Sequence, residues 1–418
     1  MKTKFIVMTS LALLALVLFA GLASAAGEDT TVASGLNGPM GILVAPDGSI
    51  WVIDSGIGGD KEMPAKDPET GKDITVKIGD TAHVVQITPD GKQVVAATLP
   101  SVLIGQETSG GSRLALLNGT LYATSGGWAE SSGPTPPPNT AAVVKIANNK
   151  VSQVASTWDI ESSQNPDGTI KEAHPYGLTA GPDGRLWVAD AGANDLLTID
   201  PATGQVKLVA TFSGVPGPLP NPNRGGAQES DPVPTGVAFD KAGNTYVSFL
   251  PGFPFLPGSA KVVKVTADGQ VSDYATGLTM ITDLRTGPDG NLYAVQLGQF
   301  TDKGPVPNSG NIIRVQAGAA SEIVVGGLSF PTSIDFNAAG DAYVTINGVG
   351  APGSGQVVMF PKLTSMAGSA LPPATLPVTG EDLTNGEWLT IGLVAVGFSL
   401  VVIGLIVLAL KRSRLAVR

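Results

Sequence analysis

The sequence contains no cysteine and only two histidines, His83 and His174, among its 418 residues. The absence of cysteine excludes disulfide bonds, thiolate metal sites and cysteine nucleophiles. Two histidines are too few for a histidine-rich metal site. Basic residues are also scarce, with 25 Lys and Arg against 35 Asp and Glu and a formal net charge of −10. This acidic balance disfavours nucleic acids and anionic lipid surfaces as partners.

Glycine and proline are abundant, with 54 and 32 residues, and 43% of all residues are hydrophobic. Many short strands joined by tight turns would give this mixture. We therefore expect an all-β protein with a hydrophobic core, which must be stable without disulfide bonds.

The first 25 residues have the features of a secretory signal peptide. Lys2 and Lys4 supply a positive start, and an apolar stretch follows over residues 5–22. The small residues 23–25 then form an Ala-x-Ala site for a signal peptidase. The sequence predicts export, and an uncleaved membrane anchor is the alternative.

The last residues contain three elements in a fixed order. The first is the pentapeptide Leu376, Pro377, Val378, Thr379 and Gly380. An uncharged stretch over 388–410 follows, long enough to cross a bilayer as a transmembrane helix, and a basic tail closes the chain. The Pro/Ala/Ser-rich residues 363–375 would be a spacer.

This order over residues 376–418 resembles the LPxTG sorting signal of bacterial cell-wall proteins. The resemblance implies that a sortase cuts after Thr379 and joins that residue to peptidoglycan. A plain single-span anchor is the alternative, and both place the body of the protein outside the membrane.

One short pattern recurs six times in the middle of the chain: a turn that ends in glycine, with an aromatic residue three positions later. The pairs are Gly48/Trp51, Gly119/Tyr122, Gly184/Trp187, Gly243/Tyr246, Gly290/Tyr293 and Gly340/Tyr343. Each pair follows the first strand of a unit that reads as four antiparallel strands, so residues 29–362 are predicted to form a six-bladed β-propeller. The last unit lacks a fourth strand, and residues 30–36 would complete it.

Long insertions between these strands all fall at one end of the predicted propeller. They cover residues 55–82, 100–111, 125–140, 159–173, 213–231, 251–258 and 297–309. Because long loops on a rigid scaffold commonly carry function, this face at the channel mouth is the expected site. The candidate ligand-binding residues are Asp54, Trp128, His174, Asp190, Thr235, Phe253, Asp283, Arg285, Gln296 and Asn347.

Asp54 and Asp190, at the ends of second strands, are candidate ligands for Ca²⁺ or Mg²⁺ in the central channel. The alternative is that these polar groups cap turns and bind backbone donors. His83 would be structural. Phe255 and Phe300 are further aromatic residues of the same loops. Exposed aromatics there would suit a sugar ring, a pigment or a protein partner, and the alternative is that the loops fold down and cover the ring.

The stretches 174–178 and 182–190 resemble NHL-type propeller repeats, and residues 35–42 and 259–290 narrow the resemblance. Together they resemble the ScyD/ScyE family of exported bacterial propellers over about residues 29–361. That family has no established catalytic residues, so the resemblance implies a fold and an extracellular place but no reaction.

Three functions are compatible with these features. The leading hypothesis is a surface-displayed, monomeric propeller that binds a small molecule, glycan or protein through its long-loop face, with binding favoured over catalysis. The second is a metal-dependent hydrolase or lyase of the gluconolactonase and streptogramin-lyase type. The third is a structural wall protein without a ligand.

Overall fold

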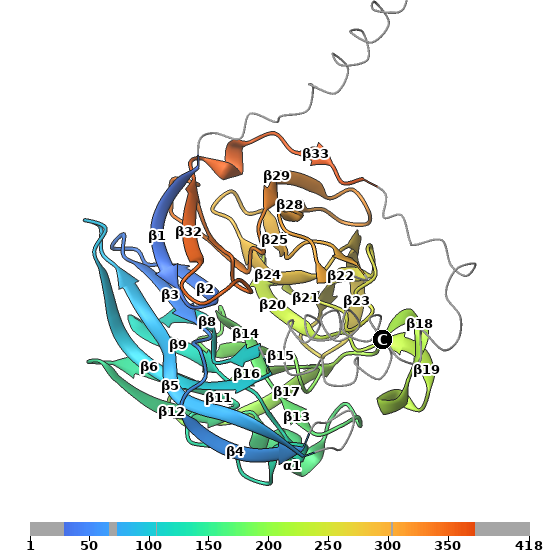
Figure 1. The fold of residues 1–418 in the computed structure, drawn as a ribbon. Helices are drawn as coiled ribbons and strands as arrows, with labels where there is room; N and C mark the ends of the chain where they lie inside the picture. The colour runs from blue at the N-terminus through green and yellow to red at the C-terminus, as the bar shows by residue number, and fades with distance from the viewer. Residues whose placement is uncertain (1–28, 67–72, 106, 302–303, 373–418) are drawn as a thin grey trace, which may run out of the picture.

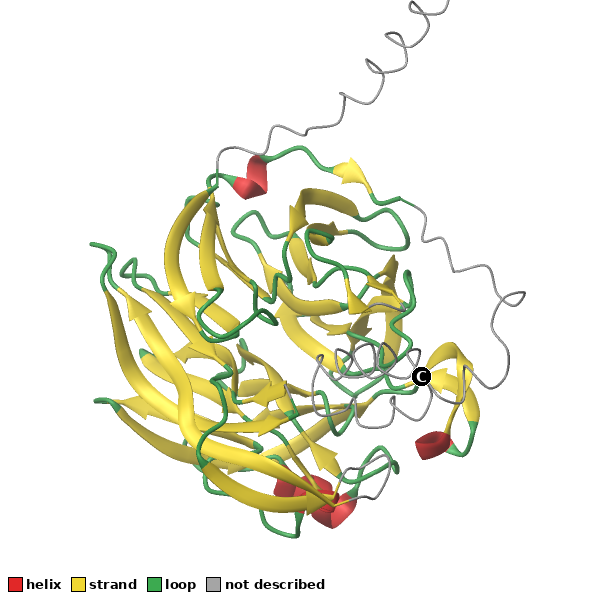
Figure 2. Cartoon of the chain, viewed as in Figure 1, coloured by secondary structure: helices red, strands yellow, loops and turns green. Residues whose placement is uncertain are grey.

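The computed structural model describes residues 29–66, 73–105, 107–301 and 304–372. Strands dominate this part of the chain, and the α-helix α1 (Trp158–Gln164) is short (Figure 2). The all-β class is therefore confirmed. No helix among the described residues has the length and apolar character needed to cross a bilayer. The predicted signal peptide, pentapeptide and transmembrane segment lie outside the described residues.

Six sheets of at least four strands each are present in the described residues, and we number them by their order along the chain (Figure 1). Sheet 1 contains β2 (Pro39–Val44), β3 (Ile50–Asp54), β4 (Lys61–Lys66), β5 (Asp73–Ile87), β6 (Gln93–Ile104) and β7 (Glu107–Ser109). Sheet 2 contains β8 (Gly111–Leu117), β9 (Thr120–Ser125), β11 (Ala142–Ala147) and β12 (Lys150–Ser156). Sheet 3 contains β14 (Pro175–Ala180), β15 (Leu186–Asp190), β16 (Asp195–Ile199) and β17 (Val206–Thr211).

The remaining three sheets follow the same pattern. Sheet 4 contains β20 (Pro234–Phe239), β21 (Thr245–Phe249), β22 (Ala260–Val265) and β23 (Val271–Leu278). Sheet 5 contains β24 (Ile281–Thr286), β25 (Leu292–Gln296), β28 (Gly310–Val315), β29 (Glu322–Leu328) and β33 (Ser369–Ala370). Sheet 6 contains β30 (Ser333–Phe336), β31 (Ala342–Ile346), β32 (Gly355–Phe360) and β1 (Thr30–Leu36).

The first strands of the six sheets form a ring around a central axis. β2, β8, β14, β20, β24 and β30 each contact the next in this order, and β30 contacts β2. A buried apolar cluster fills the space between every two neighbouring sheets, including sheets 6 and 1. This arrangement is a β-propeller, in which sheets stack face to face on sheets.

The two ends of the described chain meet in sheet 6. β1 pairs antiparallel with β32, with Thr30 opposite Met359 and Leu36 opposite Gly355. The sequence predicted this pairing. β1 covers the outer side of β32, which would otherwise be an open edge of sheet 6.

The repeated glycine-and-aromatic pattern has a local cause. The six turn glycines all have positive φ, between 74° at Gly119 and 87° at Gly290, a conformation that costs glycine little. In sheet 3 the turn residue Asp183 accepts a hydrogen bond from the Trp187 indole at 3.0 Å. In sheet 5 Asp289 accepts one from the Tyr293 hydroxyl at 2.9 Å. The aromatic residue therefore fastens the turn to the strand that follows it.

The predicted loop 55–82 consists largely of strands. β4 and the first half of β5 lie within the expected loop 55–82 and pair with each other. Ile74, Val76 and Ile78 alternate along β5 and pack with Ala65 and Val102 in a small cluster of their own. The alternation of apolar residues stabilises an extension of sheet 1 beyond the ring.

Candidate functional site

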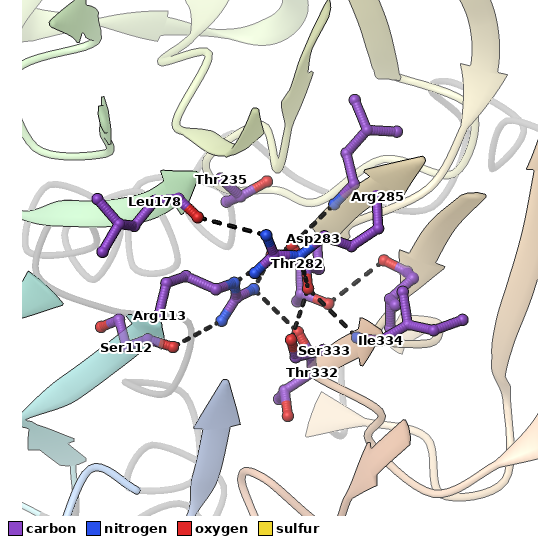
Figure 3. Close-up of polar contacts among 12 residues, drawn as sticks. Ser112, Arg113, Leu178, Thr235, Thr282, Asp283, Arg285, Thr332, Ser333 and Ile334 are labelled. Carbon is purple, nitrogen blue, oxygen red and sulfur yellow. Dashed lines mark hydrogen bonds and ion pairs between the residues drawn. The ribbon is translucent and has the colours of Figure 1, made fainter. Parts of the chain in front are cut away.

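The side chain of Arg113, on β8, lies at the axis and is fully buried. Its Nη1 donates to the backbone oxygens of Met40 and Ser112, the latter at 2.9 Å. Its Nη2 donates to the backbone oxygens of Thr282 and Thr332, the latter at 2.9 Å (Figure 3). One guanidinium of sheet 2 thus binds sheets 1, 5 and 6. Arg113 is not recognisable from the sequence, because a lone arginine at the start of a strand belongs to no motif.

Asp283, on β24, balances this charge. Its Oδ1 lies 3.3 Å from Nε of Arg113, and its Oδ2 lies 3.6 Å from Nε of Arg285. Oδ2 also accepts hydrogen bonds from the Ser333 hydroxyl at 2.5 Å and from the backbone of Ile334 at 3.2 Å (Figure 3). Burial alone would raise the pKa of Asp283, but the two arginines and these hydrogen bonds outweigh it and lower the pKa.

The axis is closed at the end where the first strands begin, which carries the long loops. An axial apolar cluster fills this end, formed by Met40, Tyr176, Ala191, Val233, Leu250, Phe255, Met280 and Leu297 with Phe253, Phe300, Phe330 and Val349 packed against them. The Tyr176 ring also lies 4.5 Å from the Arg113 guanidinium carbon, a cation–π contact.

The opposite end of the axis, which carries the short turns, is more open. The first residues of β2, β8, β14, β20 and β24 are buried, whereas their last residues are half-buried. Arg285 and Asp335 lie toward this end, on β24 and β30, and both are half-buried. Burial raises the pKa of Asp335, although the nearby charge of Arg285 opposes this shift. The short-turn end, and not the predicted long-loop mouth, is where solvent approaches the axis.

Asp54 and Asp190 each bind groups close to the end of their own strand. Asp54 accepts the backbone N–H of His83 at 2.7 Å, and its side chain lies 3.8 Å from the His83 ring. Asp190 accepts the backbone N–H groups of His174 at 2.5 Å and of Ala193 at 3.1 Å. Both carboxylates bind backbone donors at the ends of second strands, as the alternative interpretation expected.

The other polar candidates also have local partners. Gln296 accepts the backbone N–H of Thr279 at 2.8 Å, and Asn347 donates to the backbone oxygen of Ser354 at 3.2 Å. Thr235, on β20, donates to the backbone oxygen of Ile281 at 2.7 Å. We call Arg113, Asp283, Arg285 and Ser333 the axial network. Among the polar candidates, Asp283 and Arg285 belong to it, and Thr235 lies beside it (Figure 3).

The aromatic candidates belong to the protein interior. Trp128 is 4% exposed, donates its indole N–H to Gly133 at 2.9 Å and packs with Trp158. Phe255 is 1% exposed and lies 5.1 Å from the ring of Phe300. Of the two alternatives for these aromatic residues, the one in which the loops fold down and cover the ring is confirmed for Trp128 and Phe255.

A divalent metal does not fit the axis of this propeller. Here a guanidinium occupies the axis and already binds the carboxylate of Asp283. Within the described ranges, no three His, Cys, Asp or Glu side chains form a ready-made metal centre.

Comparison with known proteins gives distant likenesses. No protein-family model matches the sequence. A stretch of 132 residues is 28% identical to a gluconolactonase of Zymomonas mobilis, and it covers 30% of this chain and 33% of that protein. The chain thus matches about a third of the length of its curated relative.

Solved structures of similar shape include two enzymes. One is a gluconolactonase of Xanthomonas campestris, 12% identical over 81% of this chain and 99% of that one, with a TM-score of 0.42. The other is virginiamycin B lyase of Staphylococcus aureus, 13% identical over 79% and 97%, with a TM-score of 0.42. At these values neither likeness assigns an activity to this chain.

Proposed function

We propose that the six sheets are the complete set of blades of a six-bladed propeller. The contacts between first strands run from β2 to β30 and return to β2, and six apolar clusters separate the sheets. The pairing of β1 with β32 supports a ring that closes within one blade.

We propose that this propeller is a hydrolase or lyase that acts on a small molecule at the short-turn end of its axis. The observation that carries the proposal is the position of Arg285 and Asp335, two half-buried ionisable side chains on adjacent first strands at that end. The local likeness to a gluconolactonase supports the class of reaction and leaves the substrate open.

These two side chains have the chemistry that opening a cyclic ester requires. In that reaction water adds to the carbonyl carbon, the ring C–O bond breaks, and a proton passes from the water to the leaving oxygen. The Arg285 guanidinium would stabilise the negative charge that develops on the carbonyl oxygen. Asp335, whose pKa is raised by burial, would accept the proton from water and return it.

The test is acid release from a panel of lactones by the full-length protein, followed in a pH-stat. We expect Arg285→Gln and Asp335→Asn each to lower kcat/KM about 100-fold or more. Arg185→Gln is the matched control, because Arg185 follows a turn at the same end of the molecule without reaching the axial network. Absence of acid release across the panel, or full activity in Asp335→Asn, would contradict the proposal.

Binding of a glycan or protein is the second candidate. The observation in its favour is a pair of projecting hairpins, β4 with β5 and β18 (Val215–Asn221) with β19 (Ala227–Ser230), which extend outside the ring (Figure 1). A thermal-shift screen against glycans and peptidoglycan fragments tests it, and a shift lost on deletion of residues 216–229 would support it.

We further propose that the protein is exported and attached to the cell wall through Thr379. The order of the pentapeptide, apolar stretch and basic tail supports a location in the cell wall, with sortase and peptidoglycan as partners. Mass spectrometry of wall fragments after muramidase digestion should find peptides that end at Thr379 linked to peptidoglycan. Retention of residues 380–418 in the mature protein would contradict it.

A further inference from the structure

Two aspartates face each other at the long-loop end of sheet 3. Asp190, the last residue of β15, is directly opposite Asp195, the first residue of β16. Directly opposed residues of an antiparallel pair carry their side chains on the same face, so the two carboxyl groups are neighbours. Both residues are 0% exposed. Two like charges in this arrangement destabilise a sheet unless a third group neutralises them.

Two more carboxyl groups cover this pair. Glu161, on α1, is 0% exposed, and its Oε1 accepts the backbone N–H of Glu172 at 3.3 Å. Asp167, in the segment after α1, has a side chain that is 1% exposed and accepts a hydrogen bond from Asn194 at 3.0 Å. We call Glu161, Asp167, Asp190 and Asp195 the acidic cluster.

Several oxygen atoms of the acidic cluster are buried without a hydrogen-bond partner. They are both carboxyl oxygens of Asp195, Oδ2 of Asp190 and Oε2 of Glu161. Asp195 is the decisive one, because a fully buried carboxyl group with neither oxygen bonded is costly. The charges of Asp190, Glu161 and Asp167 all act on Asp195, which places its carboxyl group inside the cluster.

The neighbouring cations do not balance these charges. Nη2 of Arg224 lies 3.6 Å from Asp167, and the Lys171 amine donates to the backbone oxygen of Ser162 at 2.8 Å. Arg224 also pairs with Asp231 at 2.6 Å and with Glu229 at 3.9 Å, both outside the acidic cluster. The acidic cluster is therefore short of positive charge among the described residues.

We propose that the acidic cluster is a binding site for one divalent cation of the calcium class. Its free donors are all carboxylate oxygens, the ligands that Ca²⁺ prefers, and it contains no sulfur that would favour a softer metal. In the described part of the chain, the carboxyl groups of the acidic cluster are not already arranged around a single point, as the ligands of a preformed metal site would be. Binding therefore involves side-chain rotation of Asp195 and Glu161, and backbone oxygens or water complete the six to eight ligands typical of Ca²⁺.

The cation would connect α1 to the ends of β15 and β16. α1 already contacts β13 (Glu172–Ala173), which pairs with β10 (Trp128–Ala129), so this segment spans sheets 2 and 3 at the long-loop end. The site is separate from the axial network, whose carboxylate is Asp283 on sheet 5. The bound cation would hold α1 and β13 against sheet 3 and would take no part in chemistry at the axis.

Calorimetric titration of the chelator-treated full-length protein with CaCl2 at pH 7.5 tests the site. We expect one Ca²⁺ per chain and a rise in Tm of about 4 °C at a hundredfold excess over Kd. Asp195→Asn should weaken Ca²⁺ binding at least tenfold and should melt above the wild type without Ca²⁺, because it removes the uncompensated charge. A variant that merely damaged the fold would melt lower.

Asp273→Asn is the matched control, because Asp273 is an exposed carboxylate of sheet 4 paired with Lys261, and it should keep full affinity. Glu161→Gln gives a second test if Asp195→Asn does not fold. Absence of binding heat and of any Tm change with 5 mM Ca²⁺, Mg²⁺ or Mn²⁺ would overturn the proposal, as would undiminished Ca²⁺ affinity in both variants.

Discussion

At the scale of single residues, Arg113 joins more of the ring than any other side chain described above. Its guanidinium hydrogen-bonds backbone oxygens of sheets 1, 2, 5 and 6 and lies over the Tyr176 ring of sheet 3. A buried guanidinium is tolerated only when its donors and its charge are satisfied, and Asp283 supplies the charge.

Arg113→Met should destabilise the protein by about 3–5 kcal/mol, because it leaves the buried carboxylate of Asp283 without its main partner. Urea unfolding followed by circular dichroism measures this loss. The double variant Arg113→Met/Asp283→Leu should recover part of it, because neither charge then remains buried. Equal losses in the single and double variants would contradict a charge-based explanation.

Asp283 should also make the protein sensitive to acid. Its pKa is lowered in the folded state, so its contribution to stability is present above the unfolded pKa of about 3.9 and is lost as the pH falls through the folded value. Tm measured from pH 5 down to pH 2 should fall more steeply in the wild type than in Asp283→Asn. Parallel curves would show that this carboxyl group does not contribute to the acid transition.

Individual side chains of the site were harder to predict from sequence than the strands. Thr235, Asp283 and Arg285 were expected near the starts of first strands, and the structure places them at the axis. Arg113 and Asp195 were missed, because their importance comes from residues more than a hundred positions away or from an opposing strand. Burial of Trp128 and Phe255 depends on how loops fold over the ring, which no local pattern records.

At the scale of elements, the turns between first and second strands were the most predictable part of the fold. Pro-Asp-Gly turns carry their own geometry, and the following aromatic bonds back to the turn aspartate in sheets 3 and 5. The loop 55–82 was less predictable, because its strands extend beyond the repeat and pack among themselves.

Gly184→Ala should destabilise the protein by about 1–2 kcal/mol through backbone strain, because Gly184 has φ of 75° and no heavy atom lies within 4 Å of an added Cβ. Gly184→Asn should cost less, since Asn adopts this conformation more readily. Chemical denaturation of the two variants compares them. Equal costs would point to a steric cause instead.

At the scale of the whole molecule, the ring depends on strands from opposite ends of the described chain. Deletion of residues 29–36 should expose the outer side of β32 and lower Tm markedly or cause association through the open edge. Size-exclusion chromatography and thermal melting measure both effects. A synthetic peptide of residues 26–38 added in trans should restore the monomer, whereas an unchanged Tm in the deletion variant would contradict closure by β1.

The pairing of β33 with the outer strand of sheet 5 has a mechanical consequence. It consists of two opposed residue pairs, Glu322 with Ala370 and Ile323 with Ser369, next to the chain that leaves toward the C-terminus. Tension on that chain would peel this short contact apart first. Under the wall attachment proposed above, the released residues 361–372 would extend before any load reaches β32 and β1, so the propeller would keep its shape.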